Sequence, residues 1–168
     1  MKRILWWKNK HAISIVWSKQ LSVGNATLDS EHRNLIAKIN NVKRVIETGD
    51  NAALRDAFWL LESLLATHFE NEKMFAQCIN IDFDQHELAH RHMLKELQHI
   101  RDDLAKKKEV RSDSEAKLHY QLLCDWLIGH ITKEDMQMKP ILQSYPYDHI
   151  PSMSMPVVAN INQPPHRP

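Results

Sequence analysis

Residues that interrupt helices are scarce over most of this 168-residue chain. It contains only three glycines, Gly24, Gly49 and Gly129, and all seven prolines lie at or beyond Pro140. Turns between strands depend heavily on glycine and proline, so this distribution disfavours a strand-rich fold and favours long helices before Pro140. The prolines instead mark a separate segment near the C-terminal end of the sequence.

Cysteine, net charge and long apolar runs are also scarce. The two cysteines, Cys78 and Cys124, are too few for a disulfide framework or a four-cysteine zinc site within one chain. The 22 Lys and Arg nearly cancel the 21 Asp and Glu, which removes the electrostatic basis for a nucleic-acid partner. No run approaches the roughly 20 apolar residues of a transmembrane helix. We therefore expect a soluble, cytoplasmic protein.

Apolar residues recur at helical spacing in four stretches of the chain. They predict amphipathic helices at residues 29–47, 51–77, 84–107 and 112–142. Four such helices with short connections favour an all-α, antiparallel up-down-up-down four-helix bundle. We place this bundle at residues 17–143, between an N-terminal arm at residues 1–16 and an extended, proline-rich C-terminal tail at residues 144–168. In the arm, Trp6 and Trp7 are expected to pack on the bundle or on a partner, with contact to a membrane surface as the alternative.

Histidine is abundant, with 11 residues in the chain. In so histidine-rich a sequence, a single pair such as His86 and His90 is weak evidence for a metal site. However, each of the four predicted helices places histidine on its apolar face, and two of them add a carboxylate. These residues are His32, His68, Glu72, His86, His90, His130 and Asp135. Because a buried polar group without a partner costs a few kcal/mol, we expect a metal to satisfy them.

Five imidazoles and two carboxylates are more ligands than one ion uses comfortably. Two ions that share two bridging carboxylates would each reach five or six ligands once an oxygen bridge is added, which favours a dinuclear site. The identity of the second carboxylate is open on spacing alone. Glu134 lies four residues after His130, whereas Asp135 is rotated by about 140° around a regular helix. Spacing therefore favours Glu134, and Asp135 needs side-chain reach or a local change in the helix.

A further set of motifs occurs in order between Trp17 and Leu142. They are Trp17, Val23-Gly24, Asp29-Ser30-Glu31-His32, Asn40, His68-Phe69-Glu70-Asn71-Glu72, His86 with His90, and Trp126-Leu127-Ile128-Gly129-His130-Ile131 with Asp135. Together they resemble the bacterial hemerythrins. The resemblance implies an oxygen-bridged pair of iron ions, with Glu72 and Asp135, not Glu134, as bridging ligands. It also assigns His86, His90 and His130 to a coordinatively saturated iron, and His32 and His68 to an iron with an open position for dioxygen.

The same resemblance implies an apolar pocket for dioxygen. Its lining residues would be Trp126, Leu127, Ile131 and Phe69. Ordinary core packing is the alternative role for these side chains, and both roles can hold together. Among the expected ligands histidine outnumbers carboxylate five to two, which leaves less negative charge to stabilise highly oxidised iron and favours reversible binding over oxygen activation.

We therefore expect a di-iron protein that is not an enzyme and that binds dioxygen reversibly for storage, buffering or delivery. In the case of delivery, an oxygen-consuming enzyme would be the partner. The alternative is a sensor or regulator that responds to dioxygen, nitric oxide or redox state at the same iron pair. Weak peroxidase, oxidase or nitric oxide reductase activity and a structural zinc pair are further alternatives.

Overall fold

A computed structural model describes residues 14–106 and 112–150 of the chain. The long helices are α1 (Ala26–Thr48), α2 (Asn51–Cys78), α3 (Asp84–Lys106) and α4 (Ser112–Lys133). Two short 3-10 helices, η2 (Lys19–Leu21) and η3 (Asp135–Gln137), and the single-turn α5 (Lys139–Leu142) complete the elements. Within the two described ranges no strand is present, so the all-α prediction is confirmed. Trp6 and Trp7 lie outside these ranges.

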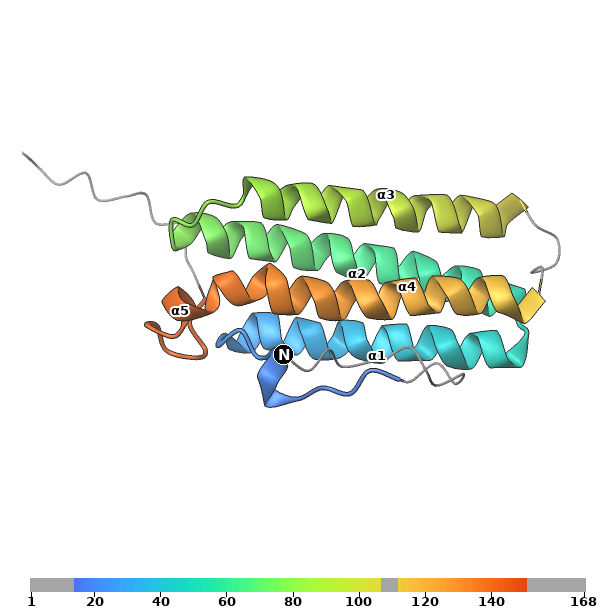
Figure 1. The fold of residues 1–168 in the computed structure, drawn as a ribbon, viewed down its shortest axis with the longest axis horizontal. Coiled ribbons are helices and arrows are strands. Elements are labelled where there is room, and N and C mark those ends of the chain that lie inside the picture. Colours follow the sequence, from blue (N-terminus) through green and yellow to red (C-terminus); the bar gives the residue numbers. More distant parts are fainter. Residues whose placement is uncertain (1–13, 107–111, 151–168) are drawn as a thin grey trace, which may run out of the picture.

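The four long helices lie side by side along one axis and alternate in direction (Figure 1). α1 packs against both α2 and α4, and α2 packs against α3. Apolar side chains from all four helices fill the space between them, including the buried Leu35, Phe58, Leu97 and Leu123. This is the arrangement expected when four amphipathic helices bury their apolar faces against one another. None of the helices in the described ranges is long and apolar enough to cross a membrane.

Capping residues fix the ends of α1 and the start of α2. The Asn25 side chain accepts hydrogen bonds from the backbone N–H groups of Thr27 and Leu28, at 3.0 and 3.2 Å, which explains why α1 begins at residue 26 and not at residue 29. Gly49 ends the helix with a φ of +69°, in the left-handed region that suits glycine. Asp50 then caps α2 by accepting from Ala53 N.

The prediction of one continuous helix over residues 112–142 is wrong at its C-terminal end. α4 ends at Lys133, and the chain continues through η3 into α5. Pro140 lies in the first turn of α5. In the interior of a continuous helix its ring would clash with the carbonyl of residue 136 and remove one backbone hydrogen bond, whereas the first turn of a new helix accommodates it.

The end of the bundle where α1 and α3 begin is closed by a second apolar cluster. Its buried members are Val23, Leu28, Phe75, Ala76, Ile79, Phe83, Met138 and Leu142. Part of the predicted C-terminal tail also lies at this end: residues 144–150 form turns and are not extended, and they hydrogen-bond to the start of α1. The remainder of that tail, residues 151–168, is outside the described ranges.

Of the predicted N-terminal arm, residues 14–16 are described. Ile15 exchanges two hydrogen bonds with the side chain of Asn40 on α1: its N–H donates to Oδ1 at 3.0 Å, and its carbonyl accepts from Nδ2 at 2.8 Å. These bonds lay the arm along α1 and bring Trp17 beside His32, with 6.4 Å between the two ring centroids.

Candidate metal centre

The seven side chains expected as metal ligands lie together inside the bundle. They come from five elements: His32 from α1, His68 and Glu72 from α2, His86 and His90 from α3, His130 from the last turn of α4, and Asp135 from η3. They form two overlapping groups. One contains Glu72, His86, His90, His130 and Asp135, and the other contains His32, His68, Glu72 and Asp135. Within each group one ligand atom per residue lies within 4.8 Å of all the others, and the two carboxylates belong to both groups.

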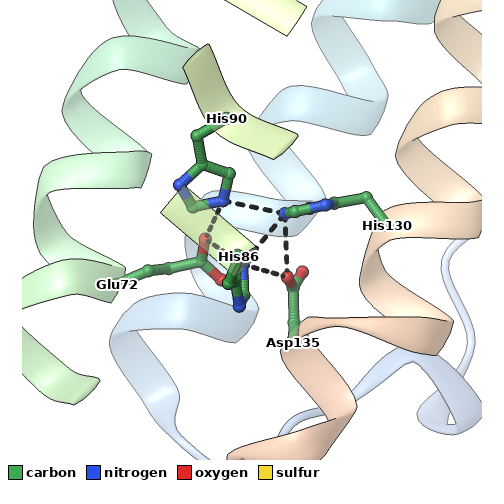
Figure 2. A group of neighbouring side chains, drawn as sticks. All are labelled: Glu72, His86, His90, His130 and Asp135. Carbon is green, nitrogen blue, oxygen red and sulfur yellow. Dashed lines mark hydrogen bonds and ion pairs between the residues drawn. The ribbon is translucent and has the colours of Figure 1, made fainter. Parts of the chain in front are cut away.

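The ligand atoms of the three-histidine group lie close to one another. Figure 2 shows its five side chains pointing toward one another. The Nε2 atom of His130 lies 2.9 Å from Nε2 of His90, 3.1 Å from Nε2 of His86 and 3.0 Å from Oδ1 of Asp135. Oε2 of Glu72 lies 3.1 Å from Nε2 of His90. Two atoms bonded at right angles to one ion at about 2.1 Å are about 3.0 Å apart, so these spacings fit ligands around a common six-coordinate centre.

The two-histidine group shares its carboxylates with the first. Asp135 directs Oδ1 toward His130 and Oδ2 toward His32, whose Nε2 is 3.1 Å away. Glu72 Oε1 lies 4.0 Å from Nε2 of His32, and Glu72 Oε2 lies 3.5 Å from Nε2 of His68. Each carboxylate therefore faces both groups, as a carboxylate that bridges two ions must.

Unsatisfied polar atoms are concentrated in this cluster. Among the described residues, the buried side-chain nitrogens and oxygens without a hydrogen bond are both ring nitrogens of His32, Nε2 of His68, and both carboxylate oxygens of Glu72 and Asp135. Buried polar atoms normally have partners, because leaving one without a partner costs about 1–3 kcal/mol. Bound cations would supply the missing partner for the ligand atoms that converge here, so the residues present fit a metal pair.

The structure brings Asp135, not Glu134, into the cluster. The spacing that favoured Glu134 assumed a continuous helix, but α4 ends at Lys133 and the backbone enters a 3-10 turn. This change of path turns the Asp135 carboxylate into the core, where it is fully buried. The Glu134 carboxylate instead accepts a hydrogen bond from Gln137 near the surface, at 3.3 Å.

Glu31 and Asn71 support the cluster from outside, a role that sequence reasoning missed. The Nδ1 atom of His68 lies 2.8 Å from Oε2 of Glu31, and Asn71 donates to the other oxygen of Glu31. With its proton on Nδ1, His68 presents the lone pair of Nε2 to the cluster. The only available signal was that both residues lie within the quoted motifs, because neither is on the apolar face of its helix.

Replacement of Glu31 by Ala is expected to weaken metal binding by roughly tenfold to a hundredfold, because His68 loses the carboxylate that orients its ring. Competition with a fluorescent chelator measures the affinity. Glu70→Ala, on an exposed position of α2, is the matched control. Equal affinities of the Glu31 and Glu70 variants would show that the hydrogen bond does not position His68 for a metal.

Aromatic rings surround the cluster. Phe69 stacks on His90 with centroids 3.7 Å apart, and Trp126 stacks on His130 at 4.5 Å. The ring centroids of Phe83 and His86 are 4.3 Å apart. Leu127 and Ile131 are buried in the core. Two of the four predicted pocket residues, Phe69 and Trp126, thus lie against the three-histidine group, although Phe69 is also 5.9 Å from His68. The position of Phe83 against a candidate ligand was not predicted.

Both carboxylates of the metal-free site are ionised. Burial raises the pKa of Asp135, but contacts with His130 and two other histidines hold it well below its ordinary value. Burial and the charge of Asp135 raise the pKa of Glu72. His68, His86 and His90 have the larger, opposite effect, and the pKa falls to about 2. Two buried negative charges in one site favour the entry of cations.

Three of the histidines have pKa values that depart from the ordinary value of a histidine. Burial lowers the pKa of His68, but Glu72 and Glu31 outweigh burial and raise it above its ordinary value. The same competition, with Asp135 and Glu72 as the stronger influence, raises the pKa of His86 to about 9. At His90 burial dominates and lowers the pKa to about 4. The raised pKa values of His68 and His86 favour protons on these two rings when no metal is bound, and these protons offset the negative charge of the carboxylates.

Metal uptake is therefore expected to release protons. A ligating imidazole must be neutral, so at about pH 6, below the raised pKa values of His68 and His86, uptake of the two ions displaces at least the protons of these two rings. Affinity should rise with pH until His86 has lost its proton near pH 9, and fall as the pH is lowered. Calorimetry of anaerobic ferrous iron uptake in two buffers with different ionisation enthalpies counts the protons. Uptake that releases none would contradict this charge balance.

Comparisons with known proteins identify the family of this chain. Residues 23–142 match the family described as "Hemerythrin HHE cation binding domain". Bacteriohemerythrin from three strains of Pseudomonas aeruginosa is 21% identical over 122 residues, which span 72% of this chain and 76% of that protein. A crystal structure of wild-type hemerythrin has a TM-score of 0.68 at 21% identity, over 77% of this chain and 98% of that one. A mutant hemerythrin structure also has a TM-score of 0.68, at 20% identity, over 77% and 97% of the two chains. Because the family match spans most of the chain, this protein belongs to the hemerythrin family of cation-binding domains.

Proposed function

We propose that this chain holds two iron ions and uses them to bind dioxygen reversibly. The observation that carries the proposal is the pair of overlapping donor groups that share Glu72 and Asp135. One group supplies five protein ligands and the other supplies four. Because the second group has one protein donor fewer, an ion held there would have the more open coordination. The position left open on the side of His32 and His68 is the proposed binding site for dioxygen. When bound, the ferrous pair would supply the electrons that hold dioxygen.

The protein's own residues would control this chemistry through charge, orientation and exclusion of water. Glu72 and Asp135 neutralise part of the charge of the ions, and Glu31 orients His68. Phe69, Trp126, Leu127 and Ile131 are proposed to form an apolar wall around the bound gas. Such a wall would keep protons and water away from the site, which would favour reversible release of dioxygen over irreversible oxidation.

Binding, rather than catalysis, fits the composition of the donor set. Five neutral imidazoles and two carboxylates stabilise highly oxidised iron less well than carboxylate-rich di-iron sites do. Storage, buffering or delivery to an oxygen-consuming partner enzyme would all use the same reversible step. Steady turnover with peroxide and a reductant would instead identify a peroxidase.

The visible absorption spectrum of the anaerobically reduced, iron-loaded protein tests the proposal. It is recorded before dioxygen is added, after addition, and again after removal. A charge-transfer band that appears with dioxygen and largely disappears on removal supports reversible binding. Immediate and permanent conversion to the ferric spectrum would contradict it and favour an oxidase.

A second candidate function, sensing of dioxygen, nitric oxide or redox state, is favoured by one observation. The C-terminal segment at Tyr147 contacts α1 at Asp29, three residues before His32. A change of ligand at the site could alter this contact. Protease protection of the segment that differs between the oxygenated and deoxygenated protein would support sensing, and unchanged protection would exclude this form of it.

A further inference from the structure

The buried carboxylate of Asp29 joins three segments of the chain. It lies on α1, is 0% exposed, and belongs to neither candidate metal group. Its Oδ2 accepts hydrogen bonds from the Ser22 hydroxyl at 2.5 Å and from the Tyr147 hydroxyl at 2.9 Å, and its Oδ1 accepts from Val23 N at 2.8 Å. A buried carboxylate is strongly destabilising without such donors. One of its three donors comes from residues that follow the bundle.

Further hydrogen bonds tie the same C-terminal residues to the start of α1. The Ala26 N–H donates to the Tyr147 carbonyl at 2.7 Å, and Asn25 Nδ2 donates to the His149 carbonyl at 2.8 Å. The Lys139 ammonium donates to the Ser22 carbonyl at 2.6 Å. We name residues 139–150 the C-terminal clasp. In Figure 1 the clasp is the orange segment at the end of the bundle, next to the start of α1.

Gly24 allows the clasp to approach the loop before α1 closely. Its φ of +87° is in the region that favours glycine, and a Cβ at this position would lie only 2.9 Å from Cγ of Gln143. A larger residue would therefore meet both backbone strain and a steric contact. The loop and the clasp are built to lie against each other.

The clasp joins the two chain segments that carry a pair of facing candidate ligands. Asp29 lies three residues before His32 on α1, and Lys139 lies four residues after Asp135. His32 and Asp135 are far apart in sequence, yet their Nε2 and Oδ2 atoms are 3.1 Å apart. Lys139, where the clasp begins, and Asp29, to which its Tyr147 bonds, are thus each three or four residues along the chain from one of these two ligands.

We propose that the C-terminal clasp controls metal exchange at the candidate centre, with Tyr147 as its positioning residue. This inference rests on the proposed metal pair. The apolar cluster that includes Val23, Leu28 and Met138 closes the same end of the bundle. An ion in the buried site would leave at this end when α1 and the segment after Asp135 separate. Loss of the Tyr147 hydrogen bond makes that opening easier, because it leaves Asp29 one donor short.

Tyr147→Phe and Tyr145→Phe form a matched pair of variants for the test. Both remove one hydroxyl from the same segment. Tyr145 is partly exposed and stacks on His149, with 4.7 Å between centroids, a contact that phenylalanine retains. The probe is Co²⁺, whose visible spectrum reports its coordination, and the readout is the rate of Co²⁺ transfer to excess EDTA. Tyr147→Phe should release Co²⁺ on the order of tenfold to a hundredfold faster than the wild type, and Tyr145→Phe at the wild-type rate.

Amide hydrogen exchange of Ala26 in the metal-free protein gives an independent readout, because this N–H is bonded to the clasp. It should exchange faster in Tyr147→Phe than in the wild type or Tyr145→Phe. If circular dichroism shows that Tyr147→Phe is unfolded, the Ser22→Ala variant is used in its place, because it removes another hydrogen-bond donor to Asp29. Equal Co²⁺ release by the wild type and the folded variant overturns the proposal, even if Ala26 exchange accelerates. A wild-type chain that takes up no Co²⁺ before the release step contradicts the proposed function instead.

Discussion

The Glu72→Gln variant is expected to lose both metal ions. Glu72 faces both donor groups, so the substitution removes a negative charge and a strong ligand from each at once. Its two buried oxygens have no hydrogen bond that would compensate, and the amide nitrogen that replaces one of them cannot ligate. Affinity at both positions should fall by on the order of a hundredfold or more. Iron per chain after anaerobic loading and gel filtration, measured by atomic emission, should fall from two in the wild type to below one.

Glu70→Gln is the matched control for this experiment. It makes the same chemical change two residues away on α2, at an exposed position outside both donor groups. Thermal unfolding gives a second readout: a saturating metal at about 100 times its Kd should stabilise the wild type and the control by about 2.7 kcal/mol, and Glu72→Gln by much less. Retention of two ions by Glu72→Gln would contradict the shared role of this carboxylate.

The His32→Ala variant is expected to separate metal binding from dioxygen binding. His32 belongs only to the two-histidine group, which would be left with His68 and the two carboxylates. The three-histidine group keeps all five of its donors. We therefore expect about one iron per chain and no reversible dioxygen spectrum, because the open position is lost with its ion.

His92→Ala, at an exposed position of α3, is the control for this variant and should behave as the wild type. His130→Ala provides the opposite case, since it removes a donor from the three-histidine group alone. Reversible dioxygen binding by His32→Ala at wild-type strength would place the open position elsewhere and would refute the proposed division between the two groups.

The fold could be predicted largely from apolar spacing and helix-ending residues. Gly49 and Asp50 separate two helices in a way that local chemistry dictates, so the predicted boundary there agrees with the structure. The start of α1 was misplaced because the cap supplied by Asn25 was overlooked. The end of α4 was misplaced because apolar spacing continues past Lys133 although the backbone does not remain α-helical. Pro140 was the signal for that break.

Some residues of the candidate site could be predicted from the sequence, and others could not. Histidine on an apolar face is conspicuous, because burial without a partner is unfavourable, so spacing alone could indicate the five histidines. Asp135 could not be chosen over Glu134 by spacing, because its direction depends on η3. The role of Glu31 could not be predicted for another reason: the residue is partly exposed, and its role depends on the contact between α1 and α2.

The C-terminal residues show the same limit of sequence reasoning. A proline-rich composition predicts an extended segment, and composition carries no information about a partner inside the same chain. Residues 144–150 are turned because Tyr147 and His149 bond to the start of α1. Asp29, read from sequence as a residue at a helix start, is the buried partner of Tyr147, and Asn25 is the partner of His149. Contacts between segments so far apart in sequence become visible only when both segments are placed in the fold.

The most direct test of the account is a crystal structure of the iron-loaded protein with anomalous diffraction recorded on either side of the iron absorption edge. Two iron peaks are predicted, roughly 3.5–4 Å apart. One should lie beside His86, His90 and His130, the other beside His32 and His68, with Glu72 and Asp135 between them. A single peak, or peaks that lie away from the two carboxylates, would contradict the shared two-metal centre on which the proposed function rests.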